Sequence, residues 1–342
     1  MKTITEIIGG AQVLLDISFE LQSCFEEALN EQQKTFMQML RCIESHLPTL
    51  IRPYAGTGRI PYQYKPFLRS QLAKNFFQIE TTTKLIERLR ADPNLRLLCG
   101  FTVIPGRSSF SRAFKYLSET DILSETLEGF ARETFKDKIV YHISRDSSAI
   151  NARETVEKKD KKNGEKPEKK RGRPRKGAEK QEIQPTGMER QITESASDSL
   201  KKLNTKCSFS CKKNSQGNIS YWKGYKLHLD VSDTGFPITA CVTGANVHDC
   251  MLAIPMEKMT EQRVVFCYSL MDPAYDAQVI TNFILSSERV PIIDRNKRKN
   301  KDRPSLDPAR KERYKIRTTV ERSYSHLKEQ PHTKSNVSKR HY

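Results

Sequence analysis

Two aspartates of this 342-residue chain follow apolar runs. Asp146 comes after the β-branched and aromatic run at 139–143, and Asp272 comes after a second apolar run at 264–270. Such runs predict strands, and a side chain at the end of a strand is held rigidly while it stays open to a ligand. Two carboxylates side by side suit a divalent cation. Either aspartate alone would more often be a turn former, so the pair needs a third observation.

A third acid lies on a predicted C-terminal helix. Four residues of this helix are spaced by three, four and seven positions, which places them on one helical face. These residues are Tyr314, Arg317, Glu321 and Lys328. The alternative interpretation is a solvated ion-pair face, because Arg317 and Glu321 are four residues apart. That alternative does not explain why the chain also carries two aspartates after predicted strands.

The elements that must position these acids are predicted to form a mixed α/β domain. Their order along the chain is strand, two-stranded hairpin, helix, strand, helix, strand and helix. The corresponding ranges are 139–143, 225–231 with 237–242, 248–259, 264–270, 274–285, 290–293 and 310–329. Because Asp230 lies within the hairpin and Asp276 begins a helix, we rank both below Asp146 and Asp272 as catalytic acids.

The first third of the chain predicts an all-α domain. Apolar residues recur at spacings of three and four from 13 to 47, and helical periodicity resumes at 67–77 and 82–89. The pair Asp92-Pro93 is typical of a turn followed by a helix start. A serine soon after Gly106 is predicted to cap a further helix that runs to about residue 117.

An insert rich in lysine, glutamate, glycine and proline separates the first strand from the hairpin. Residues 154–205 lose nearly all large apolar side chains, which predicts a disordered segment. Within it, 169–177 is similar to an AT-hook, in which glycine approaches the minor-groove floor and arginine favours its negative potential. The predicted DNA contacts are Arg171, Gly172, Arg173, Pro174, Arg175 and Lys176. The alternative interpretation is a generic polybasic linker.

The formal net charge is +18, from 59 basic and 41 acidic residues, and two segments hold the excess. Residues 158–180 carry 12 basic and 4 acidic side chains (+8), and residues 295–342 carry 16 and 5 (+11). Such an excess indicates a polyanionic partner, most often nucleic acid. The apolar runs fall short of the ~20 residues that cross a bilayer, and the eight scattered cysteines do not predict a disulfide framework. We therefore expect a soluble intracellular protein.

The helical spacing is also a family signature. The string Tyr314-x2-Arg317-x3-Glu321-x6-Lys328 matches the Y-(2)-R-(3)-E-(6)-K pattern of bacterial insertion-sequence DDE transposases of families four, five and their relatives, and the chain resembles that group. The resemblance extends over roughly residues 60–328. Its further strings, in the family's order, are 94–101 with 104–105, 145–150, 224–228, 245–249 and 270–276.

The resemblance implies an RNase H-like domain in which Asp146, Asp272 and Glu321 are the catalytic and metal-binding acids. These carboxylates would hold two Mg²⁺ ions, with Mn²⁺ as a substitute, for in-line phosphodiester cleavage and strand transfer. The residues associated with DNA strand handling in the family are Tyr314, Arg317 and Lys328.

The expected organisation has three parts. A helical DNA-end-binding domain at 1–135 precedes the catalytic domain at 136–329, and a polar tail follows at 330–342. The expected partners are the terminal inverted repeats and target DNA, bound as double-stranded DNA by a homodimer in the prokaryotic cytoplasm at the nucleoid. The tail departs from the family because Pro331 stops the last helix, so the alternative is a truncated or catalytically inactive derivative that only binds DNA.

Overall fold

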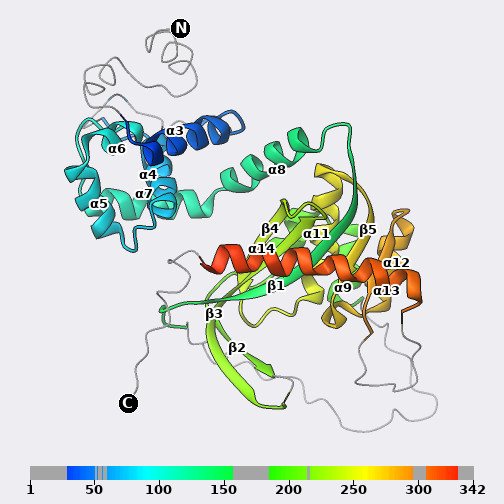
Figure 1. Cartoon of the computed structure of the whole chain (residues 1–342). Helices are drawn as coiled ribbons and strands as arrows, with labels where there is room; N and C mark the ends of the chain where they lie inside the picture. Colours follow the sequence, from blue (N-terminus) through cyan, green and yellow to red (C-terminus); the bar gives the residue numbers. More distant parts are fainter. Residues whose placement is uncertain are drawn as a thin grey trace. The chain divides into compact units, whose positions relative to one another are not determined.

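The computed structural model describes residues 29–50, 52, 56, 60–156, 185–213, 216–295 and 306–329. The chain divides into two compact units (Figure 1). Their bounds are Met1–Ile139 with Pro237–Thr239 and Arg322–Tyr342 for the first, and Val140–Phe236 with Ala240–Glu321 for the second. The first unit is helical at its N-terminal part and the second contains a mixed sheet, which confirms the predicted α/β chain with a helical N-terminal region.

The N-terminal helices pack around one aromatic and aliphatic core. They are α3 (Glu31–Glu44), α4 (Tyr64–Phe76), α5 (Thr82–Ala91), α6 (Pro93–Leu98), α7 (Arg107–Glu119) and α8 (Ile122–Thr134). Phe36, Phe67 and Phe110 are fully buried in this core, and the rings of Phe67 and Phe110 meet edge to face at 5.1 Å. The predicted helices are therefore present where the structure describes the chain, whereas residues 13–28 lie outside the described residues.

Local side-chain chemistry sets the helix starts. Asp92 accepts the backbone N–H of Leu95 at 2.9 Å and Pro93 occupies the first turn, so α6 begins where the sequence predicts. The predicted serine cap of α7 is wrong. Gly106 is its N-cap residue, because the helix already begins at Arg107 and its serines lie within the first turn.

The second unit is built on a mixed six-stranded sheet. Its strands are β1 (Ile139–Asn151), β2 (Ser208–Lys213), β3 (Ile219–Ser232), β4 (Pro237–Gly244), β5 (Val265–Met271) and β6 (Val290–Ile293). The order across the sheet is β2-β3-β1-β5-β6, with β4 paired to β3. Strands β1 and β3 are antiparallel, while β5 and β6 are parallel. The strands that carry Asp146 and precede Asp272 are thus neighbours.

Strand β1 is longer than predicted. It continues through the polar stretch to Asn151, so Asp146 lies inside the strand, opposite Leu229 of β3, and not past its end. The polar residues after Ile143 hid this continuation, because pairing with β3 and not hydrophobicity maintains the extended backbone there. Asp272, in contrast, directly follows β5 as predicted.

The helices that follow β4 are α11 (Cys250–Arg263), α12 (Gln278–Ser286), α13 (Pro308–Tyr314) and α14 (Thr318–Glu329), of which α14 belongs to the second unit only as far as Glu321. Short 3-10 turns lie at η1 (Pro273–Tyr275) and η2 (Lys315–Arg317). The single helix predicted for 310–329 is therefore divided into α13, η2 and α14. Asp307 accepts the backbone N–H of Arg310 at 2.9 Å and caps α13, with Pro308 in its first turn.

The prediction that 154–205 is entirely disordered is wrong for its C-terminal part. Helices α9 (Gly187–Thr193) and α10 (Ala196–Lys201) form there, and α9 begins with a capping box. Lys258 of α11 donates its ammonium protons to the backbone carbonyls of Gln191, Ile192 and Glu194 at 2.7–2.9 Å. These charge-assisted bonds, and the bond from the Gln191 amide to the carbonyl of Met251 at 3.0 Å, stabilise a segment that carries few apolar residues. The AT-hook-like residues 169–177 lie outside the described residues.

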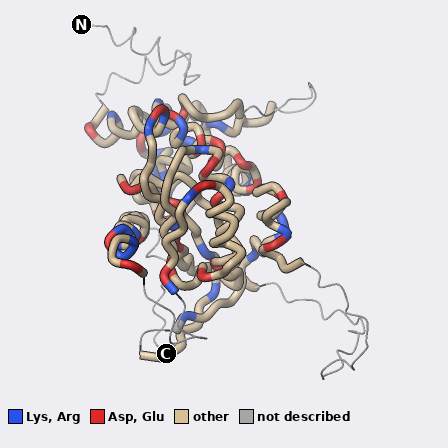
Figure 2. Tube along the Cα trace, turned by 90° about the vertical axis from the view of Figure 1, so that its right-hand side faces the viewer, with Lys and Arg blue, Asp and Glu red and all other residues tan. Residues whose placement is uncertain are grey.

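Basic and acidic residues are interspersed along the described elements (Figure 2). None of the helices in the described part of the chain is long and apolar enough to cross a membrane.

Candidate active site

Asp146 presents its carboxylate on the side of the sheet that faces α14. The backbone N–H of Ser147 donates to its Oδ1 at 2.7 Å, and Nη1 of Arg317 donates to its Oδ2 at 3.2 Å. Burial raises the pKa of Asp146, and the bonds from Ser147 and Arg317 oppose that rise. The side chain nevertheless remains 21% exposed, so a ligand can reach it.

Asp272 lies at the carboxyl end of the neighbouring strand. Its Oδ1 accepts the backbone N–H of Ala274 at 3.0 Å, which caps η1 and fixes the carboxylate. Burial, and next the negative charge of Asp146, raise the pKa of Asp272 to about 6. The two aspartates are therefore close enough to repel each other, the condition under which a cation between them is most favourable.

Glu321 reaches this pair through Arg317. Both residues lie on the η2–α14 segment, and Arg317 donates to Oδ2 of Asp146 through Nη1 and to Oε1 of Glu321 through Nη2. The guanidinium also lies 5.7 Å from the centroid of the Tyr314 ring. Burial raises the pKa of the Tyr314 hydroxyl to about 12, with smaller contributions from Asp294 and from both aspartates of the pair. The structure thus brings Tyr314 and Arg317 to the three acids.

Side-chain contacts hold the segment that carries Glu321 against β1 and β5. Arg313 of α13 lies over the Tyr268 ring at 4.3 Å and contacts Nε2 of His142 at 3.3 Å. Farther along, the Thr319 hydroxyl donates to Oγ of Ser144, two residues before Asp146, at 3.1 Å. These contacts fix where α14 starts relative to the strand of Asp146. Lys328, the last residue of the predicted set, belongs to the other compact unit and lies 6.0 Å from the Tyr324 ring.

Asp146, Asp272 and Glu321 provide carboxylate oxygens from three separate elements, and carboxylate oxygens are the type of ligand that divalent cations bind. Among the residues that the structure describes, however, no three histidine, cysteine, aspartate or glutamate side chains are grouped closely enough to hold a metal ion. The guanidinium of Arg317 forms an ion pair with each of Asp146 and Glu321, and its single positive charge offsets one of their two negative charges.

A fourth acid lies near the pair and was not singled out as a site residue from the sequence. Asp249, at the start of α11, accepts from Nζ of Lys226 at 2.9 Å, and the same ammonium donates to the carbonyl of Val247. Its charge contributes to the raised pKa of both Asp146 and Asp272. The sequence signal was present in the family-like strings that contain Lys226 and Asp249, but neither string indicates that the two residues meet.

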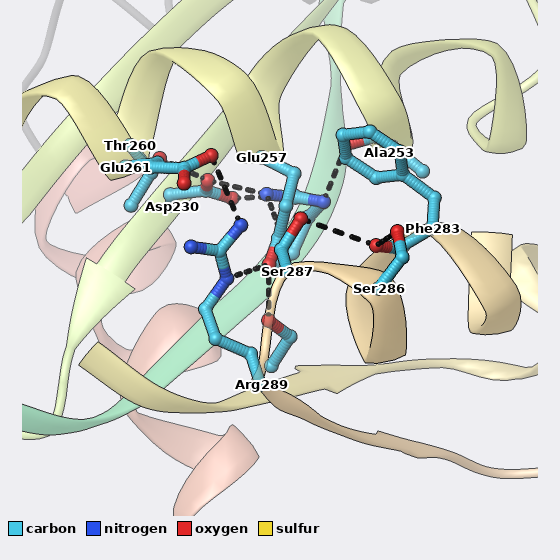
Figure 3. A network of polar contacts seen from close by, with 11 residues as sticks. Asp230, Ala253, Glu257, Thr260, Glu261, Phe283, Ser286, Ser287 and Arg289 are labelled. Carbon is cyan, nitrogen blue, oxygen red and sulfur yellow. Dashed lines mark hydrogen bonds and ion pairs between the residues drawn. The ribbon is translucent and has the colours of Figure 1, made fainter. Parts of the chain in front are cut away.

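On the opposite side of β1, a buried ion-pair network supports the site (Figure 3). Arg145 donates through Nε and Nη2 to both carboxylate oxygens of Asp230 at 2.6 Å, and through Nη1 to the carbonyl of Ala253. Its Nη2 also contacts Oε2 of Glu257, whose Oε1 accepts from Ser269 of β5 at 2.7 Å. Glu257 therefore joins the strands that carry Asp146 and precede Asp272. Both carboxylate oxygens of Asp230 are thus bonded to Arg145.

The raised pKa of Asp272 predicts a pH-dependent stability. A carboxyl that has a pKa of about 6 when folded and about 3.9 when unfolded binds a proton more readily in the folded chain. Its ionisation therefore destabilises the metal-free protein above pH 6, and this cost disappears as the pH falls towards 4. We expect Asp272→Asn to raise the free energy of unfolding at pH 7 by roughly 1–2 kcal/mol, less than the full shift because solvent screens the carboxylate.

Urea unfolding of both chains in EDTA, between pH 4 and pH 8, checks this expectation. The advantage of Asp272→Asn should shrink steadily as the pH falls below 6. An advantage that is the same at every pH, or absent at pH 7, would contradict it.

Asp146 therefore lies on β1, Asp272 directly follows the neighbouring strand β5, and Glu321 lies on α14, which contacts β1 through Thr319. Residues 142–340 match the transposase DDE domain family, and residues 24–116 match a second transposase domain family, DUF772. The first match covers more than half of the chain, which therefore belongs to the transposase DDE domain family. No curated protein and no solved structure shows significant similarity to the chain. Its membership supports a function in DNA transposition, and the family normally uses a divalent metal.

Proposed function

We propose that this chain cleaves phosphodiester bonds at the ends of its own insertion sequence and transfers the released strands to target DNA. The observation that supports the proposal is that Arg317 bonds both Asp146 and Glu321, while Asp272 lies close enough to Asp146 for that charge to raise its pKa. In this proposal the three acids are the metal ligands. They would hold two Mg²⁺ ions, or Mn²⁺ in their place. These ions would activate the attacking oxygen and stabilise the leaving 3′-oxygen.

In this proposal Arg317 binds first the acids of the site and then a phosphate of the DNA. In the free chain it forms ion pairs with Asp146 and Glu321, and on DNA it would turn to a backbone phosphate and leave both carboxylates available to hold the cation. Tyr314 lies beside it with a hydroxyl that stays protonated at neutral pH, so it donates a hydrogen bond to a phosphate or stacks on a base. Lys328, farther along α14, contacts the DNA backbone.

The partners follow from the same proposal. The substrate is double-stranded DNA that carries the terminal inverted repeats, held by a homodimer in the cytoplasm of a prokaryotic cell at the nucleoid. The RNase H-like strand arrangement fits the observed order β3-β1-β5 with antiparallel β3. An AT-hook binds the minor groove of A·T-rich DNA in this proposal. Its residues are Arg171, Gly172, Arg173, Pro174, Arg175 and Lys176.

A DNA fragment that spans one end of the element and its flanking sequence tests the proposal. With Mg²⁺ the wild-type chain should cut at the junction and leave a 3′-hydroxyl on the element strand, and EDTA should stop the reaction. Binding of the fragment without cleavage in either Mg²⁺ or Mn²⁺ would contradict the proposal and identify the chain as a DNA-binding derivative.

A further inference from the structure

Strand β2 and the beginning of β3 form a two-stranded ribbon at one edge of the sheet. The pairing runs from Ser208 opposite Gly224 to Lys213 opposite Ile219. The ribbon continues away from the strands that carry the acids (Figure 1). Because β2 is the last strand in the sheet order, the ribbon presents side chains to solvent and an unpaired strand edge.

One face of this ribbon exposes large apolar side chains. Tyr221 is 77% exposed, Phe209 is 62% exposed and Ile219 is 54% exposed. The register places Phe209 opposite Lys223 and Tyr221 opposite Cys211, so the two aromatic rings are diagonal neighbours on one face, with Cα atoms roughly 7–8 Å apart. Exposed aromatic residues on an edge strand favour aggregation unless they serve a partner, so this face is typical of a binding surface.

The positive charge of the ribbon and its flanking residues indicates a polyanionic partner. From residue 199 to residue 229 the sequence contains seven lysines and neither aspartate nor glutamate. Lys206 and Lys212 are exposed, and Lys223 lies directly opposite Phe209. Exposed aromatic rings between cations form the usual platform for unpaired nucleic-acid bases, because bases stack on the rings while the cations bind phosphates. An acidic or uncharged protein surface would not require both features together.

The ribbon also has a fixed relation to the candidate active site. It is the continuation of β3, in which Leu229 lies opposite Asp146. Tyr221 is eight residues from Leu229, which at the rise of an extended strand is at most about 27 Å. A DNA strand held at the acids can therefore extend along β3 to the aromatic face within about eight nucleotides.

We propose that the β2–β3 ribbon binds unpaired bases of the DNA strand next to the cleaved bond. Tyr221 and Phe209 stack on bases, and the ribbon lysines bind the phosphates between them. This inference rests on the proposed function, since it assigns the ribbon to the same DNA substrate.

Trp222 provides a readout from the ribbon, because it is the only tryptophan of the chain and lies opposite Ser210. Its side chain lies on the face away from Tyr221 and Phe209, so its emission reports a change of the ribbon and not stacking on Trp222 itself. The measurement uses the full-length Asp146→Ala chain in EDTA, so that binding is observed without cleavage. An oligothymidylate of about a dozen nucleotides is the probe, within the usual range of site sizes. We expect the probe to change the Trp222 emission, and Tyr221→Ala or Phe209→Ala to weaken its binding by about 5-fold or more.

Two further variants separate stacking from general effects. Tyr221→Phe keeps the ring and should bind the oligothymidylate as the parent chain does. Tyr141→Ala removes another exposed tyrosine, 59% exposed on β1, and should leave the affinity unchanged. Circular dichroism establishes that each variant is folded, which is expected because these side chains are largely exposed.

Three outcomes would overturn the assignment. The first is an affinity for the oligothymidylate that is unchanged in both Tyr221→Ala and Phe209→Ala. The second is a fully paired duplex that binds as tightly as the oligothymidylate and causes the same emission change. The third is an emission change that depends on protein concentration alone. The last would assign the ribbon to contacts between copies of the chain. Because no cleavage is measured, a catalytically inactive chain would refute the proposed function and still leave this assignment testable.

Discussion

Asp272→Asn should reduce cleavage of the element-end DNA by about 10³-fold or more. The change removes one negative charge from the proposed cation ligands, and such ligands contribute several kcal/mol to stabilising the transition state, with 1.36 kcal/mol for each factor of ten. Asparagine keeps the side-chain oxygen that accepts from the N–H of Ala274, so η1 retains its cap. The variant should therefore lose activity while it gains stability at pH 7.

That combination distinguishes an active-site effect from unfolding. Single-turnover cleavage with Mg²⁺, alongside a binding titration on the same DNA, gives the two quantities. Asp276→Asn is the matched control, since it changes an acid four positions away that follows η1. Cleavage by Asp272→Asn within a few-fold of wild type would show that Asp272 is not a catalytic ligand.

Arg145→Met should destabilise the second unit by about 3–5 kcal/mol. The substitution leaves Asp230 and Glu257 buried without the guanidinium that binds both of them, and breaking a buried pair costs this much because an uncompensated charge remains. Each of the three side chains is at most 1% exposed, so water cannot replace the lost partner without opening the core. Urea denaturation at pH 7 measures the change in unfolding free energy.

A surface ion pair of the same unit supplies the comparison. Lys202 contacts Glu194 but is 63% exposed, and Lys202→Met should cost less than about 1 kcal/mol. Equal effects of the two substitutions would mean that the buried network contributes no more than a surface pair. Because Arg145 directly precedes Asp146, its loss should also impair cleavage at temperatures where the variant is still folded.

The sequence predicted most of the elements from β3 to α12 in their order, and it failed where polar residues form or stabilise an element. The apolar runs before Asp146 and Asp272 predicted strands that are present as β1 and β5, whereas the one helix predicted for 310–329 is divided into α13, η2 and α14. The continuation of β1 was missed because Arg145 interrupts the apolar pattern, although its side chain is buried against Asp230. Tertiary contacts of this kind connect residues 85 or more positions apart and leave no local pattern.

Helices α9 and α10 were missed for a related reason. Their sequences are polar and both begin with a side-chain cap, and Lys258, more than 60 residues away, donates hydrogen bonds to carbonyls of α9 and of Glu194. The sequence predicted only one of the two ion pairs of Arg317. Its spacing to Glu321 predicted the helical ion pair, whereas its bond to Asp146 requires the packing of η2 against the sheet.

The ion pairs of Arg317 have a thermodynamic consequence. If the guanidinium must leave Asp146 and Glu321 before a cation can be enclosed, DNA and the cation bind cooperatively, and each raises the affinity for the other by the same factor. A chain without DNA would then hold the metal weakly and remain inert towards the rest of the genome. Cutting would be confined to the assembled complex by the affinity of the site itself, with no separate inhibitor.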